Sequence, residues 1–241
     1  MKHIAWAFLL LGLLSCLPAQ AQDSLRKAED AYRQGRYSAA LTEYENLLRT
    51  SPNDPFVYYN IGNCYFKMGS KGLAAANYYR AFKLNPRDND IRHNLSLALA
   101  AGGEKFVPSG VPEALHKAFY GLSQRELTGL TFLMFWICCA IGCIWLLTRH
   151  FKYLWLFTCL CALLTGCWYW ARAQQDNQSL AVVALPTAEI RSGPGTNFPA
   201  SAGIAQGHLV TIEDQRDSWY EVIVKSQGIK GWIEQSAVEK I

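Results

Sequence analysis

The sequence predicts a multidomain membrane protein with an α-helical repeat array, a two-helix transmembrane hairpin and a C-terminal all-β barrel. Three observations predict this architecture. Two windows repeat with an offset of 34 residues, two later segments are apolar over 21 and 19 residues, and short β patterns follow them. The composition agrees, because 51% apolar and 17% charged residues over 241 positions fit neither one soluble domain nor an all-membrane protein.

Residues 1–21 have the features of a secretory signal. Lys2 precedes an apolar run over Ile4–Leu14, and small residues follow up to Ala21. The run is shorter than the ~20 residues that a membrane-spanning helix needs. We expect cleavage after Ala21. A lipoprotein signal is the second interpretation, because Leu13-Leu14-Ser15-Cys16 resembles a lipobox.

The 34-residue repeat has the spacing of a helical hairpin. Small residues are expected where the two helices of a unit cross, and prolines where each second helix ends. The matched pairs are Gly35 and Gly69, Ala40 and Ala74, Tyr44 and Tyr78, and Pro52 and Pro86. These residues resemble the tetratricopeptide family. The resemblance implies an array over residues 22–102, with units 22–54 and 55–88 and a capping helix in 89–102.

Arrays of this family bind peptide segments in a concave groove lined by the first helix of each unit. The slots where chaperone-binding members hold a basic residue and an asparagine contain Leu25 and Glu29 here, so we expect an aromatic-lined groove. For its aromatic residues, packing inside the array is the alternative role. By family register, the partner-binding groove residues are Tyr32, Tyr59, Asn63, Phe66 and His93.

Two full units are fewer than the ~3 repeats that a stable array usually needs. We therefore expect the array to be supported by a partner or by the neighbouring segment of the chain. That segment, 103–126, combines a linker with apolar residues at helical spacing, Val111, Leu115, Phe119 and Leu122. It predicts either an amphipathic helix at the membrane interface or a plain connecting helix packed on the repeats.

Residues 127–147 and 153–171 contain no charged side chain and are long enough to cross ~30 Å of hydrocarbon. The connection 148–152 between them carries Arg149 and Lys152, which predicts a cytoplasmic loop by the positive-inside rule. Both flanking parts are then expected in the periplasm, on the outer side of a bacterial inner membrane. The cysteines of the two helices are expected to act as small packing residues.

A polar linker, 172–180, leads to β patterns over 181–241. Ile190, Val210 and Val222 are expected in the barrel core, and the glycines of the Arg191-Ser192-Gly193-Pro194-Gly195 stretch permit a tight loop. This loop, a Trp-Tyr strand and a final Gly-Trp-Ile strand resemble the bacterial SH3 family. The residues proposed for a peptide or glycan groove, or alternatively for the frame of the barrel, are Pro194, Trp219, Tyr220 and Trp232.

The order of these parts resembles the BatE family of the Bacteroides aerotolerance (Bat) operon. The resemblance implies a membrane complex with Bat proteins that carry von Willebrand factor A domains, controlled indirectly by a MoxR-type ATPase, and a role in stress or oxygen tolerance. We expect a non-enzymatic periplasmic scaffold that mediates protein–protein interactions. The alternative is a cell-envelope protein that binds peptidoglycan through its SH3-like domain.

The residue content argues against several other classes. The net charge of +4 is small and the basic residues are scattered, so we expect no nucleic-acid partner. The five histidines are scattered as well, so no metal or cofactor site is expected. A cell-wall hydrolase would need a Cys/His pair or paired carboxylates on a further domain, and no segment is long enough for one. We therefore expect no catalytic residues.

Overall fold

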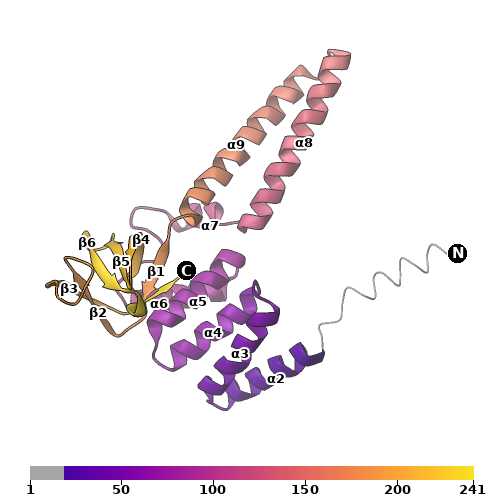
Figure 1. The fold of residues 1–241 in the computed structure, drawn as a ribbon. Helices are drawn as coiled ribbons and strands as arrows, with labels where there is room; N and C mark the ends of the chain where they lie inside the picture. The colour runs from indigo at the N-terminus through magenta and orange to yellow at the C-terminus, as the bar shows by residue number, and fades with distance from the viewer. Residues whose placement is uncertain (1–18) are drawn as a thin grey trace.

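The computed structural model describes residues 19–241 of the chain. A helical array, an apolar hairpin and a β domain follow one another along the sequence, and the hairpin projects away from the other two parts (Figure 1). The predicted Cys16 lipidation and almost all of the predicted signal segment lie outside the described residues. Of residues 1–21, only the last three are described, and they begin helix α2.

The array consists of five helices that pack in succession, α2 (Ala19–Arg33), α3 (Tyr37–Thr50), α4 (Pro55–Lys67), α5 (Lys71–Leu84) and α6 (Asn89–Ala100). Gly35 and Gly69 occupy the same turn of the two helix pairs, with φ values of 74° and 83° that favour glycine. Gly62 lies where α4 crosses α5, since a Cβ there would stand 2.6 Å from the Tyr78 ring. The helical repeat predicted from the sequence is therefore present.

The segment between the array and the hairpin forms one short helix, α7 (Glu113–Phe119). It begins directly after Pro112 and contains Leu115 and Phe119 of the predicted apolar pattern, whereas Leu122 lies beyond its end. Its His116 is buried against the array, whereas Leu115 is 62% exposed. The helix thus combines packing on the repeats with an exposed apolar side.

Helices α8 (Gln124–Thr148) and α9 (Lys152–Asp176) pack along each other as an antiparallel hairpin and are long and apolar enough to cross a membrane. Trp145 and Trp155 stack at 4.7 Å between ring centroids, and Gly142 makes room for the Trp155 ring. Arg149 and Phe151 adopt left-handed φ values of 59° and 66° in the tight connection. Large apolar side chains face outward along both helices, including Trp136 at 66% exposure.

The β domain is a seven-stranded antiparallel sheet in the order β3-β2-β6-β5-β4-β1-β7. Ile190, Val210 and Val222 are buried in its core, as the sequence predicts. Gly231 allows β6 to cross β2 closely, since a Cβ there would lie 2.4 Å from Ile190. The strands are β1 (Leu180–Val183), β2 (Thr187–Arg191), β3 (Ala200–Ala205), β4 (Leu209–Arg216), β5 (Trp219–Val224), β6 (Ile229–Glu234) and β7 (Val238–Lys240), with a short 3-10 helix, η1 (Gln235–Ala237), before β7.

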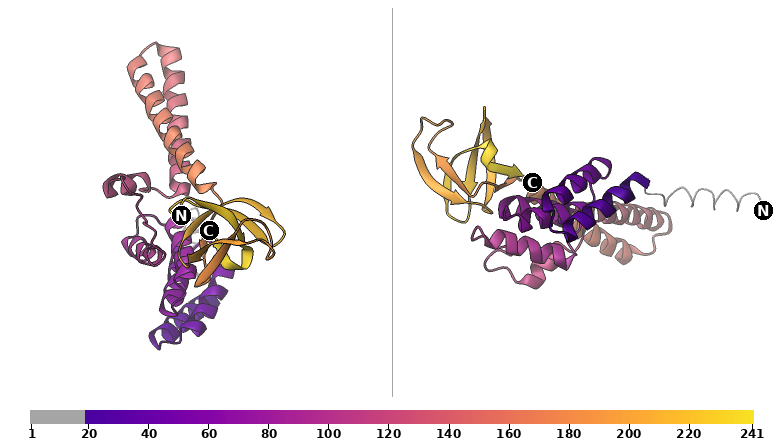
Figure 2. Two further views of the ribbon diagram at one scale, coloured as in Figure 1. Left: turned by 90° about the vertical axis from the view of Figure 1, so that its left-hand side faces the viewer. Right: turned by 90° about the horizontal axis from the view of Figure 1, so that it is seen from below.

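The β domain docks directly on the array (Figure 2). Val182 of β1 belongs to the same buried cluster as Phe82 and Leu95 of the array. Arg80 of α5 donates hydrogen bonds to the Glu239 carboxylate, at 2.5 Å, and to the Lys240 carbonyl of β7. The support expected for a two-unit array therefore comes from α7 and also from strands more than 80 residues further along the chain.

Candidate functional site

A network of amide and phenol groups joins the first helix of the second unit to the capping helix. The Tyr78 hydroxyl donates to Asn63 Oδ1 at 2.8 Å. Asn94 Nδ2 donates to the same Asn63 oxygen at 3.1 Å and to the Tyr59 hydroxyl at 3.0 Å. We call Tyr59, Asn63, Tyr78 and Asn94 the groove network. Burial raises the pKa of Tyr59 and Tyr78, so both phenols remain protonated at neutral pH.

Exposed apolar side chains flank the groove network. Phe56 lies one helical turn before Tyr59 on α4 and is 46% exposed. Leu97 lies one turn after Asn94 on α6 and is 47% exposed. Large apolar groups beside paired amides are typical of surfaces that bind a peptide, because the apolar groups supply buried area and the polar groups fix its register.

The structure separates the five predicted groove residues. Tyr59 and Asn63 meet in the groove network. Tyr32 is half-buried in the first unit, with its ring edge-on to Tyr37 at 5.2 Å, and Phe66 packs half-buried against the central cluster. His93 is exposed and lines a hollow of about 530 Å³ between α6 and residues 104–117.

The repeat pattern predicts that Tyr78 packs between units, and nothing in the pattern singles out Asn94. Tyr78 performs both roles, since its ring packs over Gly62 while its hydroxyl bonds to Asn63. A signal for Asn94 was present, because this polar residue stands between Ile91 and Leu95 on a stripe that is otherwise buried. Polar groups on such stripes are usually hydrogen-bonded.

The aromatic residues proposed for the SH3-like groove divide between the two faces of the sheet. The register pairs Trp219 with Glu234 and Glu221 with Trp232, which places both tryptophans on one face. They are only 9% and 6% exposed, and Arg216 lies 5.2 Å over the Trp232 ring. Tyr220 belongs to the core on the other face, with Lys240 4.4 Å over its ring.

Pro194 is half-buried in the loop after β2. Arg191 holds this loop, because its Nη1 donates to the Thr196 carbonyl at 3.0 Å and to the Phe198 carbonyl at 2.7 Å. Gly193 gives the Phe198 ring room to pack on the loop, since a Cβ would stand 2.5 Å from that ring. Arg191 is also the β2 residue that pairs with Trp232 of β6, so the loop begins beside one of the two tryptophans.

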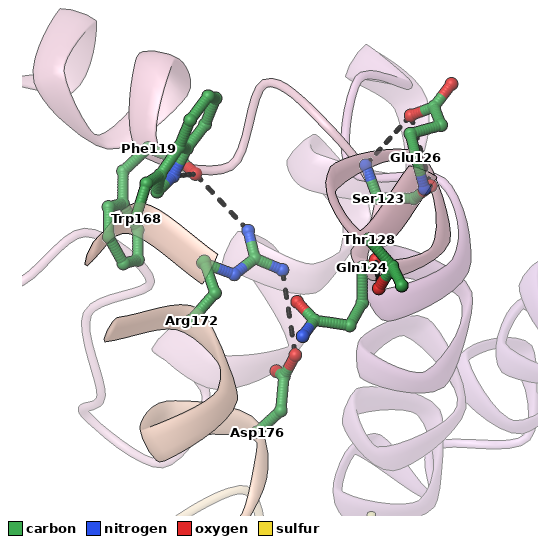
Figure 3. Close-up of polar contacts among 8 residues, drawn as sticks. All are labelled: Phe119, Ser123, Gln124, Glu126, Thr128, Trp168, Arg172 and Asp176. Atoms are coloured by element: carbon green, nitrogen blue, oxygen red, sulfur yellow. Dashed lines mark hydrogen bonds and ion pairs between the residues drawn. The ribbon is translucent and has the colours of Figure 1, made fainter. Parts of the chain in front are cut away.

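A second polar cluster lies where the hairpin meets α7 (Figure 3). Trp168 Nε1 and Arg172 Nη1 of α9 both donate to the Phe119 carbonyl, at 3.0 and 3.3 Å. The Arg172 guanidinium is buried and lies 4.2 Å over the Tyr120 ring. Its Nε and the Gln124 Oε1 are buried without a hydrogen-bond partner among the described residues. These contacts fix α7 against the base of α9.

Comparisons with protein families match both types of domain. Residues 30–69 match a TPR repeat family, residues 55–88 match the tetratricopeptide repeat, and residues 186–239 match the bacterial SH3 domain. The chain carries tetratricopeptide repeats and a bacterial SH3 domain. Tetratricopeptide repeat protein 16 of Macaca fascicularis is 31% identical over 99 residues, which cover 36% of this chain and 11% of that protein. The chain thus spans a small part of the curated relatives it matches.

Solved structures resemble the tetratricopeptide part. The first tetratricopeptide domain of Spaghetti (RPAP3), bound to an HSP90 peptide, is 22% identical and aligns over 34% of this chain and 66% of its own, with a TM-score of 0.33. A thermophilic tetratricopeptide protein of Thermus thermophilus, TTC0263, is 27% identical over 45% of this chain and 54% of its own, with a TM-score of 0.32.

Proposed function

We propose that the chain is a non-enzymatic, membrane-anchored scaffold whose tetratricopeptide groove holds a segment of a partner protein. The observation that carries the proposal is the pair of exposed apolar residues, Phe56 and Leu97, beside the groove network. The bacterial SH3 domain covers α5 on another side of the array, through Arg80 and Val182. On the groove side, Phe56 and Leu97 keep nearly half of their surface exposed, which a partner segment would cover.

The proposed anchor is the hairpin of α8 and α9. Its two ends join the array and the SH3 domain, and its tight connection carries Arg149 and Lys152. By the positive-inside rule, the connection is cytoplasmic, and both domains lie in the periplasm at the bacterial inner membrane. The anchor keeps the two domains at high effective concentration near membrane partners.

The resemblance to the BatE family gives the proposed partners. They are Bat membrane proteins with von Willebrand factor A domains, acting with a MoxR-type ATPase in an aerotolerance or stress-response complex. Support for this assignment is the combination of tetratricopeptide repeats, a hairpin long enough to cross a membrane, and a C-terminal bacterial SH3 domain in one chain.

Peptidoglycan binding through the SH3 domain is the second candidate function. It is favoured by the match of residues 186–239 to the bacterial SH3 family. In this candidate, the groove residues of the array have no part in the binding. The two functions are therefore separable by substitutions in the groove.

The test uses the full chain, solubilised from bacterial membranes after crosslinking in cells, with the co-purified proteins identified by mass spectrometry. Phe56→Glu combined with Leu97→Glu should remove a membrane-protein partner, because both changes place a charge on the proposed contact surface. The matched control is Met68→Glu, which alters a 39% exposed apolar residue at the end of α4. The control should retain the partner.

An unchanged set of partners in the double variant would contradict the groove proposal. Loss of binding to isolated peptidoglycan sacculi in the same variant would also contradict it, because the SH3 domain is untouched. All of these residues are exposed, so the circular dichroism spectrum and thermal midpoint of the double variant should match the original protein.

A further inference from the structure

A cavity of about 900 Å³ lies where the array, α7, the end of α9 and the SH3 domain meet. Its apolar wall is built by side chains from all four parts, namely Phe82, Leu99, Phe106, Phe119, Trp168 and Leu209. This volume falls in the range of sites that bind small organic ligands. None of these residues belongs to the groove network.

Polar side chains gather in one part of the cavity lining, which we call its polar end. At the polar end, Lys225 Nζ donates to Gln178 Oε1 at 3.1 Å, and Ser226 Oγ donates to Glu104 Oε1 at 2.5 Å. Lys105 also lines this end and contacts Ser109 Oγ at 3.4 Å. Both lysines are thus paired with neutral groups, which leaves their positive charge available to an anion.

The apolar end adjoins the hairpin. Trp168 lines the cavity and belongs to the apolar run of α9, which ends at Ala171. Gln175 lines the cavity seven residues further along the helix, roughly 10 Å from Trp168 at the helical rise. The cavity therefore extends outward from the level at which α9 would leave a bilayer. On the α7 side, Leu115 lines it while remaining 62% exposed, so this side is open.

We propose that the cavity takes up an acyl chain of a membrane phospholipid, with the lipid phosphate beside Lys105 and Lys225. The inference rests on the membrane anchoring in the proposed function. Water fills such an apolar space poorly, because each water molecule needs two to four polar partners. The bilayer supplies acyl chains directly at the Trp168 end, and moving a chain between two apolar surroundings costs little.

The amphipathic lining argues for a phospholipid over a purely apolar ligand. A phosphate group suits the polar end, because ammonium groups bind phosphate through charge-assisted hydrogen bonds. Glu104 stands at the same end, where Ser226 engages its carboxylate. An apolar peptide from a partner would fit the aromatic wall but would bring no phosphate to the two lysines.

The test reconstitutes the full chain in vesicles of phosphatidylethanolamine and phosphatidylglycerol that contain a phosphatidylglycerol with a photoactivatable acyl chain. After illumination, the labelled peptides are mapped by mass spectrometry. Labels are expected on α8 and α9 and also on the peptides that contain Phe82, Leu99 and Leu209. These three residues lie outside the hairpin and line the cavity.

Ala118→Trp should abolish the cavity labels, because Ala118 lines the cavity and the indole would fill it. Ala114→Trp is the matched control, since both alanines are exposed on α7 and Ala114 is absent from the lining. Lys105→Gln combined with Lys225→Gln should lower cavity labelling by the phospholipid probe and leave labelling by a photoactivatable fatty acid unchanged.

The outcomes separate this inference from the proposed function. Labels confined to α8 and α9 in the original protein would overturn the cavity proposal and retain the anchor, whereas labels on neither helix would overturn the anchor itself. Cavity labels that persist in Ala118→Trp would also overturn the proposal, as would a peptide found in the cavity in place of lipid. The map of the original protein decides the question even if a variant folds poorly.

Discussion

His116 and Arg92 lie side by side in an aromatic cluster, although both side chains can carry positive charge. Arg92 Nη2 is 3.2 Å from His116 Nδ1, and the rings of Phe106 and Tyr120 enclose the imidazole at 5.0 and 4.7 Å. Burial lowers the pKa of His116, and the Arg92 guanidinium lowers it further. The neutral imidazole accepts a hydrogen bond from Arg92, whereas a protonated imidazole would repel the Arg92 guanidinium.

The lowered pKa of His116 predicts weaker docking of α7 in acid. As the pH falls, His116 in the unfolded chain takes up a proton near pH 6.5, before His116 in the folded protein does. The stabilisation that the neutral imidazole gives to the folded state is therefore complete above about pH 6.5 and declines as the pH falls below it. The Glu113 carboxylate raises the pKa of His116, and the Arg172 guanidinium lowers it. We expect His116→Asn to reduce the fall of the thermal midpoint on acidification. An equal fall in both proteins would contradict this role.

Helix capping repeats at the element scale with the same 34-residue spacing as the packing residues. The Asp54 carboxylate accepts from the Phe56 amide at 2.9 Å at the start of α4. The Asp88 carboxylate accepts from the amides of Asp90, at 2.9 Å, and Ile91, at 3.2 Å, at the start of α6. Each cap satisfies amides that have no partner inside the helix.

Asp88→Ala should therefore destabilise the array by about 1 kcal/mol, through loss of the α6 cap. Asp88→Asn should cost much less, because the asparagine oxygen accepts the same hydrogen bonds. Urea unfolding of the detergent-solubilised protein, followed by circular dichroism, measures the difference. Equal losses in both variants would point to the charge of Asp88 in place of its hydrogen bonds.

At the scale of the whole molecule, the SH3 domain packs directly against α5 of the array. The two backbones approach closely at glycines. A Cβ on Gly72 would stand 2.1 Å from the Val183 carbonyl oxygen, and one on Gly102 would stand 2.6 Å from the Gly207 carbonyl carbon. Gly207 itself has a φ of 89°. The interface thus depends on backbone contact that any side chain would disrupt.

Gly72→Ala should separate or shift the two domains, although alanine favours a helix over glycine by roughly 0.5–1 kcal/mol. We expect a net loss of roughly 1–3 kcal/mol, typical of overpacking. The Cys64 side chain is fully buried, so alkylation of this thiol requires opening of the array and reports this loss; burial also raises the pKa of the thiol to about 11. Gly129→Ala in α8, with nothing within 4 Å of its Cβ, is the control. Equal alkylation rates in both variants would contradict the docking role.

The sequence by itself determined the elements and the contacts of each repeat. Their causes are local, since Gly62 meets Tyr78 within one 34-residue unit and the apolar runs of α8 and α9 are contiguous. The apolar pattern of residues 103–126 extends beyond α7, since Val111 precedes Pro112 and Leu122 follows the end of the helix.

Only the tertiary structure decided how these elements meet. Asn94 reaches Asn63 across 31 residues, and Arg80 reaches Glu239 across 159. Neither contact produces a periodic pattern of residues in the sequence, because a hydrogen bond between distant segments depends on how whole helices and strands pack. The groove network, the docked SH3 domain and the cavity beside α9 all arise from contacts of this kind.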